Sequence, residues 1–291
     1  MQNTLAEKED KIIAQNYAAS HLKVLDERYH LKSKTDLIVN KGIRLDFNGK
    51  NSVTIYNVDT VAEGDYTRSG TNRFGALVEL GTGTQTFTLS QDKAFTFTID
   101  RGNYEDSMMA QEVAKAIKRQ VDEVSTPATD VYRLSVLTAY AIANSKGVVA
   151  GSAVTYQTIY SLILAQQAAM SELSVPEEGR VLYITPTNLN LLKRDPEFMR
   201  DCDTTQKDLK KGVIGEVDGL KIVVCPSTYF VAKFEFMIVK DDLLVSPMKF
   251  NSVRTLDDVQ GIDGWVAEGR RYYDAFLPTQ KIAGLRIYTK S

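Results

Sequence analysis

Residues 63–85 constrain this fold most, because they contain few large apolar side chains and so cannot cover a core of their own. Glycine, threonine and serine dominate the segment, as in the run 81–84. Alternating apolar residues flank it at 53–55 and 87–89, with the two-residue period of β-strands. A further alternation follows at 95–99. The sequence therefore predicts a long, protruding β-hairpin followed by another strand.

After Gly102 the apolar residues recur at helical spacing. Four of them fall four positions apart: Met109, Val113, Ile117 and Val121. This spacing predicts a long amphipathic helix, capped near Asn103. We expect the pair Thr126-Pro127 to break it and a second helix to follow over residues 130–144. Thr155 is the expected N-cap of a third helix over residues 156–173.

Strand and helix signals alternate from residue 181 onward. The apolar run 181–184 predicts a buried strand, and Thr185-Pro186 then places proline at the first position of a helix. Two apolar runs flank Asp218-Gly219, a dipeptide that tight hairpin turns favour, so we expect a β-hairpin there. Further strand candidates cover residues 236–239, 243–245, 265–272 and 282–288. The predicted fold class is α+β, without internal repeats.

The charge balance argues against a broad nucleic-acid-binding surface. Thirty-five basic and thirty-seven acidic side chains leave a formal charge of −2, which leaves no excess of cations to neutralise phosphates. Cys202 and Cys225 have no histidine nearby, so neither a disulfide framework nor a zinc site is indicated, and a reducing cytoplasm fits. No stretch approaches the roughly 18 apolar residues of a membrane span, so we expect neither secretion nor membrane insertion.

Residues 1–50 have no sustained apolar period except an amphipathic stretch over residues 11–29. We interpret residues 1–50 as an arm that needs a partner surface. The only two histidines, His21 and His30, lie in this arm. The rest of the chain therefore has no histidine for general acid–base catalysis.

Signatures of catalysis are absent from the sequence. It contains no phosphate-binding loop, zinc-protease motif or serine-hydrolase elbow. Three carboxylate pairs lie in polar, turn-like contexts: Glu177-Glu178, Asp241-Asp242 and Asp257-Asp258. Residues 193–211 alternate in charge sign, which is typical of a solvated loop or subunit contact. We expect no catalytic residue, cofactor or metal, and a buried, inert thiol at Cys225.

Four stretches, taken with the order of the elements, carry a family resemblance. They are residues 95–100 followed by Asp106, 124–132, 214–227 and 269–287. Over residues 10–288 the chain resembles the major capsid proteins of tailed bacteriophages, which share the Hong Kong 97 fold. The resemblance implies the following parts: N-terminal arm, 1–50; E-loop hairpin and flanking strands, 51–100; spine helix and peripheral domain, 101–145; axial domain, 146–250; return to the peripheral domain, 251–291.

The resemblance also implies a function. The chain is expected to be a non-enzymatic head protein that assembles into hexamers and pentamers of an icosahedral phage or prophage capsid around double-stranded DNA. It implies a virion location, assembly in the host cytoplasm, a portal protein, and only weak, non-specific DNA contact, with no membrane partner. Some relatives carry a long N-terminal helical extension that this chain lacks, so a separate scaffolding protein or the stretch 11–29 is expected to guide assembly.

Two other interpretations remain open at this point. An encapsulin-like nanocompartment shell shares the fold but encloses cargo proteins. A soluble α+β enzyme using an acidic loop pair such as Asp241-Asp242 belongs to a different class.

The composition of the hairpin predicts whether the subunits of such a shell are linked covalently. Some relatives form an isopeptide bond between an E-loop lysine and an asparagine of a neighbour. Residues 59–92 contain no lysine, and the two cations there are Arg68 and Arg73. Guanidinium groups stay protonated and are poor nucleophiles. We therefore expect a non-covalent shell, with Arg68 and Arg73 as subunit-interface candidates that pair with carboxylates of a neighbour.

Overall fold

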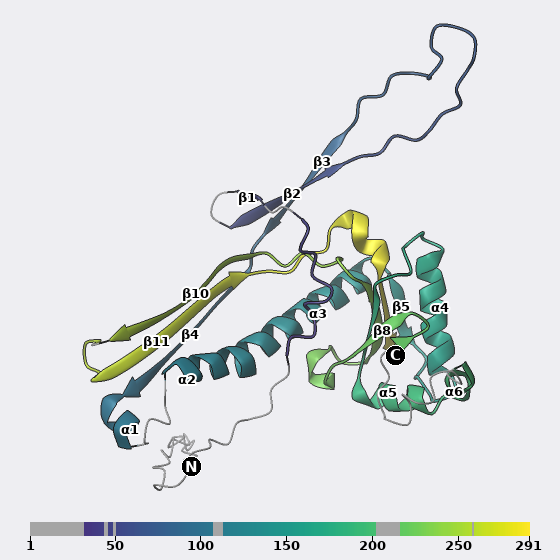
Figure 1. Ribbon diagram of the computed structural model, residues 1–291. Helices are drawn as coiled ribbons and strands as arrows, with labels where there is room; N and C mark the ends of the chain where they lie inside the picture. The colour runs from purple at the N-terminus through teal and green to yellow at the C-terminus, as the bar shows by residue number, and fades with distance from the viewer. Residues whose placement is uncertain (1–31, 44–45, 49–50, 107–112, 202–215, 258) are drawn as a thin grey trace, which may run out of the picture.

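The computed structural model describes residues 32–43, 46–48, 51–106, 113–201, 216–257 and 259–291, which form three β-sheets and several helices (Figure 1). Strands β2 (Ser52–Val58) and β3 (Thr82–Thr88) pair in antiparallel fashion, and β1 (Asp46–Asn48) lies beside β2. Figure 1 shows the chain between β2 and β3 projecting far from the rest of the molecule. The expected protruding hairpin is confirmed.

A second antiparallel sheet has the order β10 (Met248–Asp257), β11 (Gly264–Tyr273) and β4 (Gln91–Asp100). It runs alongside the long helix of the molecule (Figure 1). The strands β4 and β11 match the predicted alternations at 95–99 and 265–272. Strand β10 was not predicted, because polar residues occupy both of its faces, as the run Asn251-Ser252 shows.

The long helix contains α2 (Val113–Gln120), a π-helical turn over Val121–Ser125, and α3 (Thr126–Ala143). The prediction that Thr126-Pro127 breaks it is wrong: the backbone of Thr126 is helical, and its N–H donates to the carbonyl of Val121, five residues back. A π turn widens the helix where the proline ring would otherwise crowd the carbonyl of Glu123. Pro127 then stands in the first turn of α3, where its missing N–H costs little.

The start of this helical region also differs from the prediction. Helix α1 (Arg101–Asp106) directly follows β4, and the carboxylate of Asp100, rather than Asn103, provides the cap by accepting from the N–H of Asn103 at 3.2 Å. Met109 lies outside the described residues. Val113 and Ile117 are only partly buried, so the apolar stripe of α2 is not sealed within a single copy of the chain.

The third sheet forms the centre of the main body. Its strand order is β5 (Gly147–Gly151), β12 (Leu285–Lys290), β9 (Phe234–Lys240), β6 (Arg180–Ile184), β8 (Leu220–Val224) and β7 (Glu216–Val217). Three helices accompany it: α4 (Ile159–Ser171), α5 (Pro186–Lys193) and α6 (Pro196–Asp201).

Both faces of this sheet are buried, so alternate residues of one strand enter two different cores. Val181 and Tyr183 of β6 pack into a cluster with Leu134 and Leu137 of α3. Leu182 and Ile184 pack into a second cluster, on the α4 and α5 side. On its other side, α3 contacts the β10–β11–β4 sheet, since the Arg271 guanidinium of β11 donates to the hydroxyl of Thr129 at 3.0 Å. Helix α3 therefore connects the body with that sheet.

Two local predictions are confirmed and two boundaries differ. Helix α5 begins at Pro186 as predicted, and the hydroxyl of Thr185 caps it by accepting from the N–H of Asn188 at 3.3 Å. Asp218 and Gly219 both have positive φ, at 46° and 72°, which a tight turn of the primed type requires, and Val217 pairs with Leu220 across it. The third helix begins at Ile159, three residues later than predicted, and its N-cap is Thr158 rather than Thr155. The expected strand over 282–288 is a 3₁₀ turn up to Gly284 and a strand only from Leu285.

Candidate assembly surfaces

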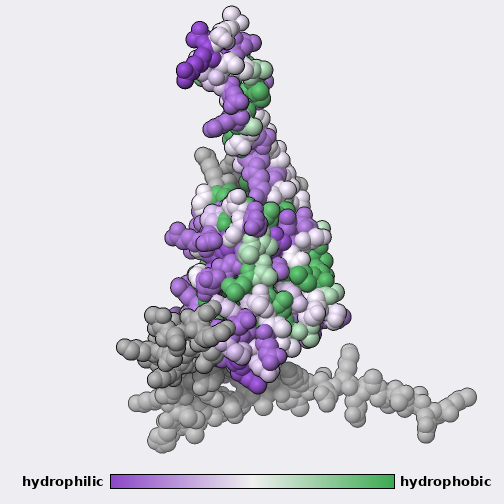
Figure 2. Space-filling view, turned by 90° about the vertical axis from the view of Figure 1, so that its right-hand side faces the viewer, coloured by the Kyte–Doolittle hydropathy of each residue, from purple (hydrophilic) through white to green (hydrophobic). Residues whose placement is uncertain are grey.

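The projecting hairpin carries a row of exposed apolar side chains, which we call the loop strip: Val61, Tyr66, Phe74, Leu77, Val78 and Leu80. Phe74 is 89% exposed and Leu77 103%. Figure 2 shows hydrophobic atoms along this hairpin. A row of large apolar residues at such exposure marks a surface that another molecule covers. The sequence interpretation stressed the shortage of apolar residues for a core and missed that those present stay uncovered.

The tip of the hairpin has a defined structure of its own. The N–H of Thr67 donates to the carbonyl of Arg73 at 3.0 Å, and the Arg73 guanidinium donates to the carbonyl of Gly70 at 3.2 Å. The rings of Tyr66 and Phe74 meet edge to face, with centroids 5.0 Å apart. These contacts hold the tip in one shape before any partner binds, which lowers the entropy cost of binding.

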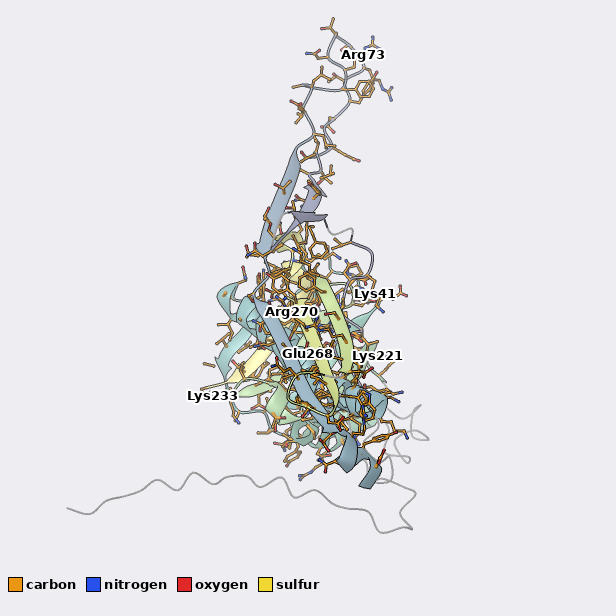
Figure 3. All side chains as sticks on the ribbon, turned by 90° about the vertical axis from the view of Figure 1, so that its left-hand side faces the viewer. Lys41, Arg73, Lys221, Lys233, Glu268 and Arg270 are labelled. Carbon is orange, nitrogen blue, oxygen red and sulfur yellow. The ribbon has the colours of Figure 1, made fainter. Side chains whose placement is uncertain are left out.

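The two predicted interface residues both lie at this tip. Arg73 is labelled at the far end in Figure 3, and Arg68 precedes the Ser69-Gly70 turn; both are exposed. Within the described residues no side chain pairs with the guanidinium of Arg68. The nearest lysine beyond the hairpin, Lys93, belongs to β4 and lies opposite Arg271 of β11, at the base rather than at the tip.

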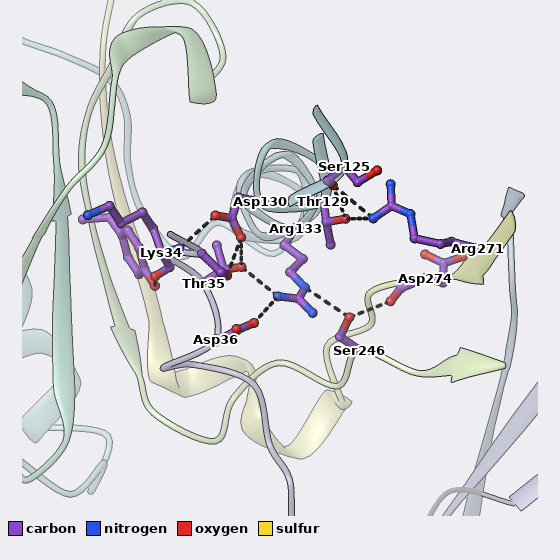
Figure 4. A network of polar contacts seen from close by, with 12 residues as sticks. Lys34, Thr35, Asp36, Ser125, Thr129, Asp130, Arg133, Ser246, Arg271 and Asp274 are labelled. Atoms are coloured by element: carbon purple, nitrogen blue, oxygen red, sulfur yellow. Dashed lines mark hydrogen bonds and ion pairs between the residues drawn. The ribbon is translucent and has the colours of Figure 1, made fainter. Parts of the chain in front are cut away.

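A buried polar network fixes the chain segment at residues 33–36 to α3 (Figure 4). The carboxylate of Asp130 accepts from the hydroxyls of Ser33 and Thr35, at 2.9 and 2.5 Å, and from the N–H of Lys34 at 2.8 Å. One turn later, the Arg133 guanidinium donates to the Thr35 hydroxyl at 2.9 Å. Asp130 is 2% exposed, so the loss of these partners would leave its charge buried and uncompensated.

A second buried carboxylate, Asp274, fixes the base of the hairpin. It accepts from the Tyr132 hydroxyl of α3 at 2.5 Å and from the N–H groups of Ser90 and Ala275, each at 2.7 Å. Burial, reinforced by this hydrogen bond to Asp274, raises the pKa of Tyr132 above its ordinary value. Next to this point, Phe87 of β3 stacks on Phe276 at 4.7 Å between ring centroids. The hairpin is therefore fixed to the body at its base.

Two of the three carboxylate pairs lie on adjacent turns, since the N–H of Asp241 donates to the carbonyl of Gly179, next to Glu177-Glu178, at 2.9 Å. Asp241 forms an ion pair with Lys240, and Asp242 is a turn residue with φ of 55°. The main-chain carbonyl of Asp242, not its carboxylate, accepts from Lys281 Nζ at 2.7 Å. Among the residues that the structure describes, no three His, Cys, Asp or Glu side chains gather as metal ligands. Asp258, Cys202, His21 and His30 lie outside those residues.

The Cys225 thiol is buried in the core beneath α3. Burial raises its pKa to about 12, which suppresses the reactive thiolate. The prediction that Cys225 is a buried core residue is confirmed. Within the described part of the chain, no helix is long and apolar enough to span a bilayer.

Comparison with solved structures identifies the fold. The capsid structure of cyanophage P-SCSP1u matches with a TM-score of 0.72 at 11% identity, over 94% of this chain and 92% of that one. The mature capsid of bacteriophage PhiM1 matches with a TM-score of 0.64 at 11% identity, over 99% of both chains. A structure from Mycobacterium phage Che8 matches with a TM-score of 0.63 at 15% identity, over 96% and 97%. No family model and no curated protein matches the sequence.

Proposed function

We propose that this chain, which has the Hong Kong 97-like fold of tailed-phage capsid proteins, is the major capsid protein of a phage or prophage. In this role it assembles into hexamers and pentamers of an icosahedral head around double-stranded DNA. The observation that carries the proposal is the match to capsid chains over nearly the whole of both chains.

The loop strip supports the same role. A single copy leaves Phe74 and Leu77 in solvent, whereas a neighbouring subunit can cover them. Arg68 and Arg73 lie at the tip, between Tyr66 and Phe74 of this strip, and can donate hydrogen bonds to carboxylates of that neighbour. We assign residues 51–100 to the E-loop and its flanking strands, 1–50 to the arm, 101–145 and 251–291 to the peripheral domain, and 146–250 to the axial domain.

The charge of the chain fits a container for DNA. A formal charge of −2 provides no strongly basic lining, so packaged DNA would contact the shell weakly and non-specifically. Assembly in the host cytoplasm with a separate scaffolding protein and a portal protein completes the proposal.

Negative-stain electron microscopy of the purified full-length protein tests the proposal. We expect hexamers, pentamers or closed shells, and a size-exclusion peak far above the 32.4 kDa of one chain. A protein that stays monomeric at high concentration, alone and in the lysate of cells that produce the phage, would contradict it. Shells that enclose a cargo protein and no DNA would instead indicate a nanocompartment.

A further inference from the structure

Strand β10 forms an open edge of the β10–β11–β4 sheet. Eight of its ten residues are exposed, and in the described structure it pairs with β11 alone (Figure 1). Its register with β11 is unbroken from Phe250 to Asp257. A regular edge of this length presents a row of backbone donors and acceptors to any strand of matching shape.

Of the usual protections of an edge strand, β10 has charged side chains, at Lys249, Arg254 and Asp257, but it is neither short nor interrupted after Phe250. It contains no proline or glycine, and its one irregularity lies at its start, between Met248 and Phe250. Phe250 and Val253 are 40% and 44% exposed. A long, regular edge with exposed apolar side chains can accept a further strand.

We propose that β10 pairs with β10 of a second copy of this chain, in antiparallel fashion across a two-fold axis at Val253. In this register the two Val253 residues face each other, and Phe250 lies opposite Leu256 of the second copy. Lys249 lies opposite Asp257 at each end. Between these pairs, Ser252 lies opposite Arg254 and Asn251 opposite Thr255. The strand is thus complementary to itself, with an apolar pair at the axis, polar pairs beside it and opposite charges at both ends.

Neighbouring registers fit less well. An axis at Arg254 brings two guanidinium groups face to face, which is destabilising. An axis at Ser252 places Phe250 opposite Arg254 and leaves Asp257 beyond the paired region. The register at Val253 is therefore the one that the sequence of β10 favours.

The paired sheet would be continuous through both copies. Residues that lie opposite each other in an antiparallel pair project to the same face, so the helices of both copies would cover one side of a six-stranded sheet. Ser252 and Arg254 would extend the polar face on which Glu268 and Arg270 lie (Figure 3). The pairing goes beyond the proposed function and requires no closed shell.

Cysteine cross-linking of the full chain tests the register. Opposite Cα atoms in an antiparallel pair lie about 4.5–5.5 Å apart, within reach of a disulfide. In a Cys202→Ser background, we expect oxidised Val253→Cys to give a band at twice the 32.4 kDa chain mass that reductant removes. The matched control is Thr255→Cys: its two copies would lie four residues apart, roughly 13 Å, and should not bond.

A mixing experiment makes the test independent of Val253. Asn251 of one copy lies opposite Thr255 of the other, so a mixture of Asn251→Cys and Thr255→Cys chains should form a disulfide dimer, while each alone should not. Dimers in the mixture and with Val253→Cys support the pairing even if no shells form. Shells that show no such cross-link, or equal cross-linking by Thr255→Cys alone, overturn the pairing and leave the proposed function intact.

Discussion

At the scale of single residues, Asp274 connects three parts of the chain that are far apart in sequence. Its carboxylate receives hydrogen bonds from Ser90 at the end of the hairpin, Tyr132 of α3 and its own neighbour Ala275. It is 2% exposed. A buried carboxylate with three donors is difficult to replace, because each donor would lose its partner without gaining water.

We therefore expect Asp274→Ala to lower the free energy of unfolding by about 3 kcal/mol or more, since hydrogen bonds to charged groups are each worth about 1.5–3 kcal/mol. Urea denaturation monitored by circular dichroism measures this. The control is Asp65→Ala, an exposed position on the hairpin, which should change stability by less than about 0.5 kcal/mol. Equal effects of the two substitutions would show that Asp274 does not fix the hairpin base.

The thiol of Cys225 gives the fold a sensitivity to alkaline pH. Its pKa of about 12 in the folded state lies above the ordinary value of 9.0, so the unfolded chain loses this proton first as pH rises. The stability that follows from the raised pKa is fully present below about pH 9 and is lost as pH rises towards 12.

The Cys225→Ala variant isolates this effect. Between pH 9 and 11, the free energy of unfolding of the native chain should fall more steeply than that of the variant, by up to about 1.4 kcal/mol per pH unit. Urea titrations at a series of pH values measure both slopes. Parallel slopes would mean that the thiol titrates normally in the folded protein.

At the scale of elements, the hairpin combines a fixed base with an uncovered end. Phe87, Phe276 and Asp274 hold the base, whereas Phe74 and Leu77 are exposed and contribute little to the folding of one copy. The folding of one copy therefore depends on the base of the hairpin, whereas the assembly of copies depends on its exposed end. The π-helical turn plays a different part, since it lets one helix continue across Pro127 and reach both the body and the β10–β11–β4 sheet.

This separation predicts the behaviour of the double variant Phe74→Ser/Leu77→Ser. Its melting temperature should match that of the native chain within a degree or two, because both side chains are exposed in the monomer. Shell formation, followed by light scattering, should fall strongly, because the loop strip loses its apolar contacts. Val231→Ser, an exposed apolar position in the body, is the matched control and should assemble normally. Normal assembly of the double variant would rule out the loop strip as a subunit contact.

At the scale of the whole molecule, the anchoring of residues 33–36 defines where the arm can be cut. Removal of residues 1–30 leaves Ser33, Thr35 and Asp130 in contact, so we expect the body to unfold at an unchanged temperature while assembly is impaired. Removal of residues 1–37 also takes away the partners of Asp130 and should lower the melting temperature clearly. Circular dichroism and sedimentation of both truncations decide this, and identical melting of the two would contradict the anchoring role.

Whether the subunits are linked covalently is also a property of the assembled particle. Without a lysine in residues 59–92, we expect shells held by many weak contacts, each exposed Arg68 or Arg73 pair contributing only about 0–1 kcal/mol. Assembled particles boiled in detergent should give a single band near 32.4 kDa on a denaturing gel. A ladder from dimers to hexamers would demonstrate covalent links and refute this prediction.

Features that depend on neighbouring residues could be read from the sequence. The Asp218-Gly219 turn, the helix start at Pro186 and the glycine-rich hairpin over 63–85 could all be predicted, because turn chemistry and apolar period are local properties. The family resemblance likewise followed from the order of such local elements.

Which surfaces remain open depends on how remote segments pack together. Strand β10 owes its existence to β11, and its polar composition gave no alternation to detect. Helix continuity across Pro127 depends on the π turn before it. Whether Phe74 is covered, or whether Asp130 meets Thr35 across 95 positions, depends on segments remote in sequence. Burial is a property of the packed chain, and the period of a sequence shows which side chains can be buried but not what lies opposite them.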